Sequence, residues 1–358
     1  MIETRVLRVD ATQPDPAVID QAALAIRQGK LVAFPTETVY GLGANALDAE
    51  AVKRIFEAKD RPATDPLIVH LAHIGQLSTC ASQVPPAARK LGLAFWAGPL
   101  TMVLPKRPAV PDCVTAGLPS VALRVPSHPV ARALMEMAGV PVAAPSANRF
   151  SRPSPTTAAH VLADLEGRID LVLDAGPTDI GIESTIVDFT VDPPIMRRPG
   201  GLTLEQIRTI VPGVVARAWY GGPEAAQIAP GQLTRHYAPR AEVTLYEGTP
   251  ERVIHWVAAD TRTLTARGAR VGVLAPEEDL RALATELAPL AASGRVKVRP
   301  YGARSSPERS AREFFAALRA LDETDVTHIL ATSIGTDGVG LAVRDRLFRA
   351  AEGRVRKV

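Results

Sequence analysis

Apolar residues recur at helical spacing in several stretches of the N-terminal part of the chain. From Asp15 to Lys30 they fall at every third or fourth position, which predicts a helix that ends near Gly29. Asp48 stands at the N-cap of a second predicted helix, and the Arg61–Pro62 step ends it because a proline disfavours helical backbone in the residue before it. The same spacing predicts further helices at 86–95, 129–138, 156–165 and 204–210.

Short apolar runs between these helices have the length of β-strands. They lie at 31–35, 67–71, 102–104, 121–125, 140–144, 171–173 and 186–189. Strands and helices interleave, but they do not follow a strict strand–helix repeat. We therefore expect an α/β domain with one twisted, mixed sheet.

The periodicity disappears at 212–240 and returns afterwards as a regular alternation of strands and helices. This pattern predicts an N-terminal domain at 1–211, a linker at 212–240 and a C-terminal domain at 241–358. In the last domain, strands are expected at 243–246, 271–274, 296–299 and 328–331, and helices at 250–266, 276–287, 307–321 and 339–350. Such an alternation is typical of a small Rossmann-like α/β domain.

Composition narrows the class of protein. The chain has 358 residues, of which 46% are hydrophobic, enough to bury the cores of two domains. Its 41 Lys and Arg residues against 38 Asp and Glu give a net charge of +3 without clustered basic runs, which disfavours a protein that coats nucleic acid. Cys80 and Cys113 form neither a metal pattern nor a disulfide framework. Because no apolar segment resembles a signal peptide or a membrane span, we expect a soluble cytoplasmic protein with no membrane partner.

Two glycine-rich segments are similar to nucleotide-binding loops. Gly41–Ala46 matches the pattern G-x-G-x-x-A, but five residues separate it from the preceding strand and no clear ribose-binding acid follows, so we reject NAD binding there. Gly335–Gly340 leads into a predicted helix and could hold an anion, although an ordinary loop is the simpler interpretation.

Three groups of polar side chains in or beside the predicted elements are candidates for a chemical role. Lys59 and Arg61 end a helix: either they complement its dipole, or the proline that follows extends the backbone so that both reach one polyanion such as a triphosphate. Ser146 and Asn148 follow a strand and are either ordinary turn formers or a hydroxyl and an amide that serve a phosphate. His70 lies inside a strand, where a buried structural role is more common than a ligand contact.

Taken together, several segments carry a resemblance that none of them carries alone. They are FPTETVYGLGANA (34–46), the stretch 58–70, GPLTMVLP (98–105), SVALRVPSHP (120–129), APSANRFSRPSPT (144–156), ESTIVDF (183–189) and RRPGG (197–201). In this order they resemble the YrdC-like domain of the L-threonylcarbamoyladenylate synthase family, whose signature is the pair Lys59-x-Arg61 and Ser146-x-Asn148. The run Arg235–Pro239 and the domain after it resemble the long, two-domain form, so the resemblance covers essentially the whole chain.

The resemblance implies both a fold and an activity. The fold would be a twisted mixed sheet around a central basic cavity, followed by the small Rossmann-like domain. The enzyme would be a nucleotidyltransferase that joins L-threonine, bicarbonate or CO2, and ATP into threonylcarbamoyl-AMP and pyrophosphate, with Mg²⁺ accompanying ATP. Downstream proteins would then use the product to modify tRNA. Attack of a carbamate oxygen on the α-phosphate mainly needs positioning and charge neutralisation, which suits a site of cations and hydroxyls.

The resemblance also assigns site residues. Those that would hold L-threonine are Thr36, His70, Arg124 and Ser184. Those that would surround ATP are Lys59, Arg61, Asp65, Ser120, Ala144, Ser146, Asn148, Ser154, Arg198 and Tyr237. Lys59 and Arg61 would be catalytic because they neutralise phosphate charge, and Tyr237 would reach over the nucleotide from the linker as part of a lid.

Two positions depart from the family pattern. The family has asparagine at the position of Asp65 and threonine at the position of Ser120. Ser120 keeps the hydroxyl. A carboxylate at position 65 would repel ATP unless it meets Mg²⁺, a sugar hydroxyl or a base edge.

Three alternatives stay open from the sequence. A basic cavity could grip RNA directly, although the chain has no RRM or KH signature. YrdC-like domains also occur in hydrogenase-maturation carbamoyltransferases, but this chain has neither their acylphosphatase region nor their zinc-finger-like region. The C-terminal domain carries no catalytic constellation, so we expect it to regulate the enzyme or to dock a partner.

Overall fold

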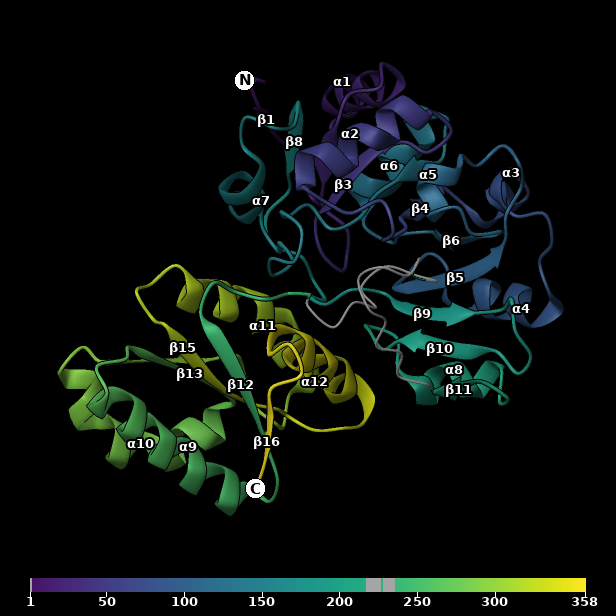
Figure 1. Ribbon diagram of the computed structural model, residues 1–358. Coiled ribbons are helices and arrows are strands. Elements are labelled where there is room, and N and C mark those ends of the chain that lie inside the picture. The colour runs from purple at the N-terminus through teal and green to yellow at the C-terminus, as the bar shows by residue number, and fades with distance from the viewer. Residues whose placement is uncertain (1, 217–226, 228–235) are drawn as a thin grey trace. The chain divides into compact units, whose positions relative to one another are not determined.

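The computed structural model describes residues 2–216, 227 and 236–358, which form two compact units (Figure 1). The first comprises Met1–Phe150 and Ser154–Leu233, and the second comprises Ser151–Pro153 and Thr234–Val358. Most of the predicted linker at 212–240 lies outside the described residues, although Tyr237, the residue expected to act as a lid, is described.

The segment Ser151–Pro153 belongs to the second unit, which the sequence did not indicate. Ala238 donates its backbone N–H to the carbonyl of Ser151 at 2.6 Å. Arg152 forms an ion pair at 3.0 Å with Asp322, whose side chain is almost fully buried. A short piece of the N-terminal sequence is therefore held by residues more than eighty positions away.

The first unit is built on a mixed sheet, as the sequence predicts, and its described residues supply eleven strands. The sheet contains both parallel pairs, such as β4 with β6, and antiparallel pairs, such as β5 with β6. In sheet order the strands are β1 (Arg5–Arg8), β8 (Leu171–Asp174), β2 (Val32–Phe34), β3 (Gly41–Asn45), β7 (Val142–Ala143), β4 (Ile68–His70), β6 (Ser120–Arg124), β5 (Leu100–Pro105), β9 (Thr185–Asp188), β10 (Ile195–Arg198) and β11 (Val215–Ala216).

The helices of this unit follow the predicted periodicity closely. The helices of the first unit are α1 (Pro16–Arg27), α2 (Ala49–Lys59), α3 (Leu77–Cys80), α4 (Pro86–Phe95), α5 (Asp112–Thr115), α6 (Pro129–Ala138), α7 (Ala158–Leu165) and α8 (Leu204–Ile210), with a 3₁₀ turn at Ile74–Gln76. Three of them, α4, α6 and α8, begin and end at the predicted residues. Asp48 caps α2 by accepting from the N–H groups of Glu50 and Ala51, which confirms the predicted start of that helix.

Strand β3 was not expected, because its sequence is the glycine-rich segment that is similar to a dinucleotide loop. It pairs antiparallel with β2 and contributes to the interior of the sheet. A Cβ at Gly43 would lie 2.7 Å from the ring of Phe34 and 2.9 Å from Val142. The glycine is therefore required by packing against two side chains, and the segment is a strand where nucleotide binding would need a strand-to-helix turn.

The core of the first unit lies between the sheet and the helix pair α1 and α6, which pack against each other. Ile19 and Ile26 of α1 and Leu134 of α6 are buried there against Val32 of β2 and Leu173 of β8. This core fixes the ends of β2 and the loop that follows it, where several candidate site residues lie.

The second unit is a parallel sheet with helices on both faces. Among its described residues the strand order is β14 (Val296–Pro300), β13 (Val271–Ala275), β15 (His328–Thr332), β12 (Glu242–Glu247) and β16 (Val355–Lys357). The helices are α9 (Pro250–Ala266), α10 (Glu277–Ala292), α11 (Pro307–Asp322) and α12 (Gly338–Ala350). Helix α9 packs on α10, and α11 packs on α12 (Figure 1).

The predicted alternation of strands and helices is thus present, with β16 as an additional strand. When its strands are counted in chain order, the sheet runs 3-2-4-1-5. The doubly wound Rossmann order is 3-2-1-4-5-6, so the two sheets share parallel strands and two covered faces but differ in strand order. No helix in the described part of the chain is both long and apolar enough to cross a membrane.

Candidate active site

The two signature motifs meet through Lys59. This residue ends α2, and Asp60 after it adopts a left-handed conformation (φ 54°) that turns the chain away from the helix axis. The buried Lys59 side chain donates from Nζ to the carbonyl of Ser146 at 2.5 Å and to the carbonyl of Asn148. The structure therefore brings the K-x-R and S-x-N segments together, as the resemblance implies, through a lysine that orders the second motif.

Arg61 is buried and fixes the loop that follows α2. Its Nε donates to the carbonyl of Asp65 at 3.0 Å, and its Nη2 donates to the carbonyl of Pro66 at 2.7 Å. The Asp65 carboxylate forms an ion pair with the same guanidinium at 3.0 Å, and both side chains are almost fully buried. The negative charge at position 65 is therefore matched by Arg61, a partner that the sequence argument did not consider.

A second buried ion pair joins Arg124, at the end of β6, to Glu37, in the loop after β2. Nη2 of Arg124 lies 2.8 Å from Oε1 of Glu37, and both side chains are nearly inaccessible to solvent. Within the described residues neither Glu37 oxygen nor Nε of Arg124 has a hydrogen-bond partner of good geometry. Burying a polar atom without a hydrogen-bond partner costs free energy. Such atoms are therefore often found where a ligand supplies the missing hydrogen bonds.

His70 lies beside Arg124, because β4 and β6 pair in parallel with these two residues as neighbours in register. Its Nδ1 lies 3.3 Å from the carbonyl of Ile68, and its ring meets Phe34 edge-on at 6.3 Å between centroids. Burial, with a smaller contribution from the Arg124 charge, lowers the pKa of His70 to about 3. The imidazole is therefore neutral at physiological pH and can act as a hydrogen-bonding group but not as a cation.

Arg198 and Ser184 form a third cluster. Arg198 of β10 donates to the Ser184 carbonyl from Nε at 3.1 Å and from Nη2 at 2.9 Å, and Nη2 also reaches Oγ of Ser184 at 3.1 Å. The Ser184 hydroxyl is 2.8 Å from Oγ1 of Thr101 on β5. A residue expected to contact ATP thus positions one expected to contact threonine.

Three of the remaining candidates have local hydrogen-bonded roles. Thr36 donates from Oγ1 to the carbonyl of Val39 at 2.7 Å and so shapes the loop that carries Glu37. Ser154 donates to Glu183 at 2.5 Å, and both are buried. Ala144 continues β7 and donates its N–H to the carbonyl of Ile68 at 2.8 Å.

The last two candidates are Ser120, which is not brought to these clusters, and Tyr237, which belongs to the other unit. Ser120 begins β6 and pairs with Pro105, four residues from Arg124 and therefore about 13 Å away along the strand. Tyr237 belongs to the second unit, where its buried ring packs against Phe315 at 5.4 Å and the Arg346 guanidinium lies 5.3 Å from its centroid. Arg235 of the same motif lies outside the described residues.

Sequence reasoning missed Glu37, Glu183 and Thr101. Each makes a buried contact with a residue that the resemblance assigns to the site. A partial signal was present for Glu37, a carboxylate two residues after the predicted strand 31–35, because a carboxylate is seldom buried without a partner. Thr101 gives no such signal because threonine is ordinary in strands.

Comparison with known proteins shows which family the chain resembles. Residues 24–200 match the Sua5_yciO_yrdC family model, described as telomere recombination, and residues 202–352 match the model described as the C-terminal domain of threonylcarbamoyl-AMP synthase. The threonylcarbamoyl-AMP synthase of Bacillus subtilis is 44% identical over 342 residues, which are 95% of this chain and 94% of that protein. The chain belongs to the threonylcarbamoyl-AMP synthase family.

Other members of this family extend the likeness to structure. The Pyrococcus abyssi threonylcarbamoyl-AMP synthase is 45% identical over 94% of this chain and 95% of its own. The crystal structure of P. abyssi Sua5 in complex with L-threonine has a TM-score of 0.89 and 44% identity and covers 99% of each chain. A second structure of that protein carries alanine in place of a histidine and the tyrosine after it. The two-domain form of the family is thus the form that this chain resembles throughout.

Proposed function

We propose that this chain makes threonylcarbamoyl-AMP from L-threonine, bicarbonate or CO2, and ATP, and releases pyrophosphate as a nucleotidyltransferase. The observation that carries the proposal is the pairing of Lys59 with the Ser146–Asn148 segment, which joins the family's two signature motifs in one buried junction. The likeness to family members over almost the full length of the chain supports the same activity.

Threonine is assigned to the Glu37–Arg124 pair. The amino acid is a zwitterion, and this pair presents a guanidinium and a carboxylate 2.8 Å apart in a buried setting. The Arg124 fork suits the substrate carboxylate, and Glu37 suits its ammonium group. Inserting threonine would exchange one ion pair for two and would satisfy the polar atoms that lack hydrogen bonds. The neutral His70 beside Arg124 adds no charge that would compete for the carboxylate.

The chemistry then needs a neutral amine, a carbamate and an in-line displacement. The substrate ammonium loses one proton to solvent and its nitrogen adds to CO2. A second proton leaves the nitrogen for solvent as the carbamate forms. A carbamate oxygen attacks the α-phosphorus of ATP, and the bond to the β-phosphate breaks as pyrophosphate leaves. Lys59 and Arg61 are assigned to the phosphates, where their positive charge offsets the charge that develops on the oxygens.

Mg²⁺ enters as part of the ATP substrate. The described residues contain no group of three or more His, Cys, Asp or Glu side chains arranged to hold a metal ion. Mg²⁺ binds mainly to triphosphate oxygens and keeps several of its waters, so we assign it to the ATP and not to a protein cage. We assign the later use of the product, transfer to a tRNA adenosine, to downstream proteins.

The test is synthesis by the full chain. ATP, Mg²⁺ and bicarbonate are incubated with each amino acid in turn, and the adenylate is detected by mass. We expect product with threonine alone and, for Lys59→Ala, a loss of about a hundredfold or more in its formation. Lys53→Ala is the matched control, because this lysine lies on the same helix but is exposed and pairs only with Glu50. Equal product with every amino acid, or full activity of a folded Lys59→Ala, would refute the proposal.

A further inference from the structure

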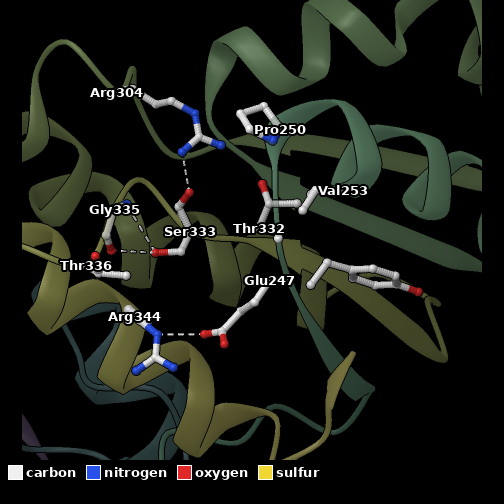
Figure 2. Close-up of a pocket in the computed structure, with 11 residues that line it drawn as sticks. Glu247, Pro250, Val253, Arg304, Thr332, Ser333, Gly335, Thr336 and Arg344 are labelled. Carbon is white, nitrogen blue, oxygen red and sulfur yellow. Dashed lines mark hydrogen bonds and ion pairs between the residues drawn. The ribbon is translucent and has the colours of Figure 1, made fainter. Parts of the chain in front are cut away.

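The second unit contains a cavity of about 290 Å³ at the carboxyl ends of two neighbouring strands (Figure 2). Tyr246, Glu247 and Gly248 come from the end of β12, and Thr332 and Ser333 come from the end of β15. The remaining lining comes from the first turn of α9, the loop after β14, the loop after β15 and the side of α12. The cavity belongs entirely to this unit and shares no residue with the candidate active site.

The cavity lies at the carboxyl edge of the sheet. Strands β12 and β15 are parallel neighbours, and the helices that follow them belong to different helix pairs, α9 with α10 and α12 with α11. The loops that leave the two strands therefore turn toward opposite faces of the sheet. Open parallel sheets bind ligands outside the carboxyl ends of their strands.

Two arginines provide the positive charge of the cavity, and each is held in place by a carboxylate. Arg304 donates to both oxygens of Asp279, at 2.6 Å and 2.8 Å from Nη2, and from Nη1 to the carbonyl of Ser333 at 2.5 Å. Arg344 donates from Nε to Glu247 at 2.6 Å. Both arginine side chains remain about one third exposed, so each is held in one orientation while part of the side chain stays accessible.

The rest of the lining is divided by chemistry. In Figure 2, Arg304 and Arg344 lie on either side of Ser333, and Pro250 and Val253 lie across the cavity from Gly335 and Thr336. One wall thus presents hydroxyl and backbone groups together with the arginines, and the opposite wall is apolar. A ligand that fits both walls has a charged head group and an uncharged body.

Gly340, in the first turn of α12, packs closely against the loop after β15. A Cβ at Gly340 would lie 3.2 Å from the carbonyl carbon of Gly335, so a side chain there would push the loop by a few tenths of an ångström. The same segment is the one whose sequence is compatible with an anion-binding turn. The glycine-rich run Gly335–Gly340 thus lies beside a cavity in which an anion could bind.

We propose that this cavity binds a small organic phosphate, with the phosphate facing the two arginines and the Ser333–Thr336 loop and the organic part against Pro250 and Val253. Asp279 and Glu247 match the charge of the two guanidiniums, so the phosphate would be held by guanidinium N–H groups and by the hydroxyls of the Ser333–Thr336 loop and not by a net positive charge. A volume of about 290 Å³ lies at the small end of ligand pockets and suits a molecule no larger than a sugar phosphate or a mononucleotide. The competing interpretation is that the arginines serve only as structural ion pairs.

Calorimetric titration of the full chain distinguishes the two interpretations. Ribose 5-phosphate is the principal probe, because it lacks the base that an ATP site would recognise, and ribose is its matched control. Inorganic phosphate and AMP are the further probes. The variants are Arg344→Gln and Arg304→Gln, and the control is Arg309→Gln, an exposed arginine of α11 that pairs with Glu313.

We expect saturable binding of ribose 5-phosphate at one site, no binding of ribose, and affinity reduced about tenfold or more in Arg344→Gln and Arg304→Gln but not in Arg309→Gln. Arg344→Gln should keep the thermal midpoint and the synthase activity of the parent protein in the absence of probe, which separates this site from the proposed function. Failure of every phosphate to bind, equal binding by inorganic phosphate and the organic phosphates, or unchanged affinity in both cavity variants would overturn the proposal.

Discussion

Gly200 packs so closely against the backbone of residues 183–185 that the position has no room for a side chain. A Cβ at this position would overlap the carbonyl oxygen of Glu183 and would lie 2.5 Å from both the carbonyl carbon of Ser184 and the amide nitrogen of Thr185. All of these atoms are backbone, so no side-chain rotation can relieve the overlap. Gly200→Ala must therefore displace the segment 183–185, which carries Ser184 against Arg198 and Thr101.

The loss of stability expected for Gly200→Ala follows from the cost of placing an extra methyl group in a packed interior. Added methyl groups in packed interiors destabilise proteins by about 1–3 kcal/mol, and a clash with backbone belongs at the upper end. For a unit of this size, a loss of about 3 kcal/mol lowers the thermal midpoint by roughly 6–12 °C. Because the Ser184 hydroxyl moves with the segment, the KM for threonine should rise by about tenfold while the KM for ATP changes less.

The measurements are a thermal melt and initial rates of pyrophosphate release at varied threonine. Gly213→Ala is the control, since a Cβ there meets no heavy atom of the described residues within 4 Å. That variant should stay within about 0.5 kcal/mol of the parent protein. A Gly200→Ala variant that melts within about 1 °C of the parent and keeps its threonine KM would show that the close packing of Gly200 on this segment does not hold.

Three further predictions concern the buried groups that we assign to threonine. Arg124→Met should destabilise the protein by about 3–5 kcal/mol because it leaves Glu37 charged and unpaired, and Arg124→Met with Glu37→Met should recover most of that loss in a urea unfolding series, which a purely steric effect of methionine would not do. Glu37→Gln should raise the KM for threonine far more than that for ATP. His70 has a folded pKa of about 3 against an ordinary value of 6.5, so its contribution to stability is complete above pH 6.5 and is lost as pH falls toward 3. Between pH 7.5 and 5.5 this amounts to about 1.4 kcal/mol, which His70→Asn should remove from the pH dependence of unfolding; an unchanged slope would contradict the pKa.

Helices were predictable where a proline or a capping residue accompanied the apolar period. Pro86 and Pro129 start α4 and α6 at the expected positions because a proline is tolerated in the first turn and not later. Strand β3 was missed for the opposite reason. Glycine is a poor strand former, and the need for it at Gly43 arises from the ring of Phe34, a contact that only the folded chain creates.

Those parts of the site that depend on motif spacing were predictable, and those that depend on contacts made only in the folded chain were not. Motif resemblance indicates residue types at fixed spacing, and it therefore pointed to Lys59 and Ser146, which do meet. It could not indicate that Asp65 matches the charge of Arg61, because that contact depends on how the loop after α2 folds back. It also gave no signal for Thr101, whose role depends on a neighbouring strand.

The arrangement of three strands explains why such residues can act together although they lie far apart in sequence. Thr101 of β5 pairs in register with Arg124 of β6, and Arg124 pairs in register with His70 of β4. Residues directly opposite one another in a sheet project from the same face, so these three side chains form one row across the strands. A shift of one residue in β6 would turn Arg124 to the other face and separate it from Glu37, His70 and Thr101 at once. The buried Glu37–Arg124 ion pair therefore favours a single register, because in any shifted register both charges would be buried without partners.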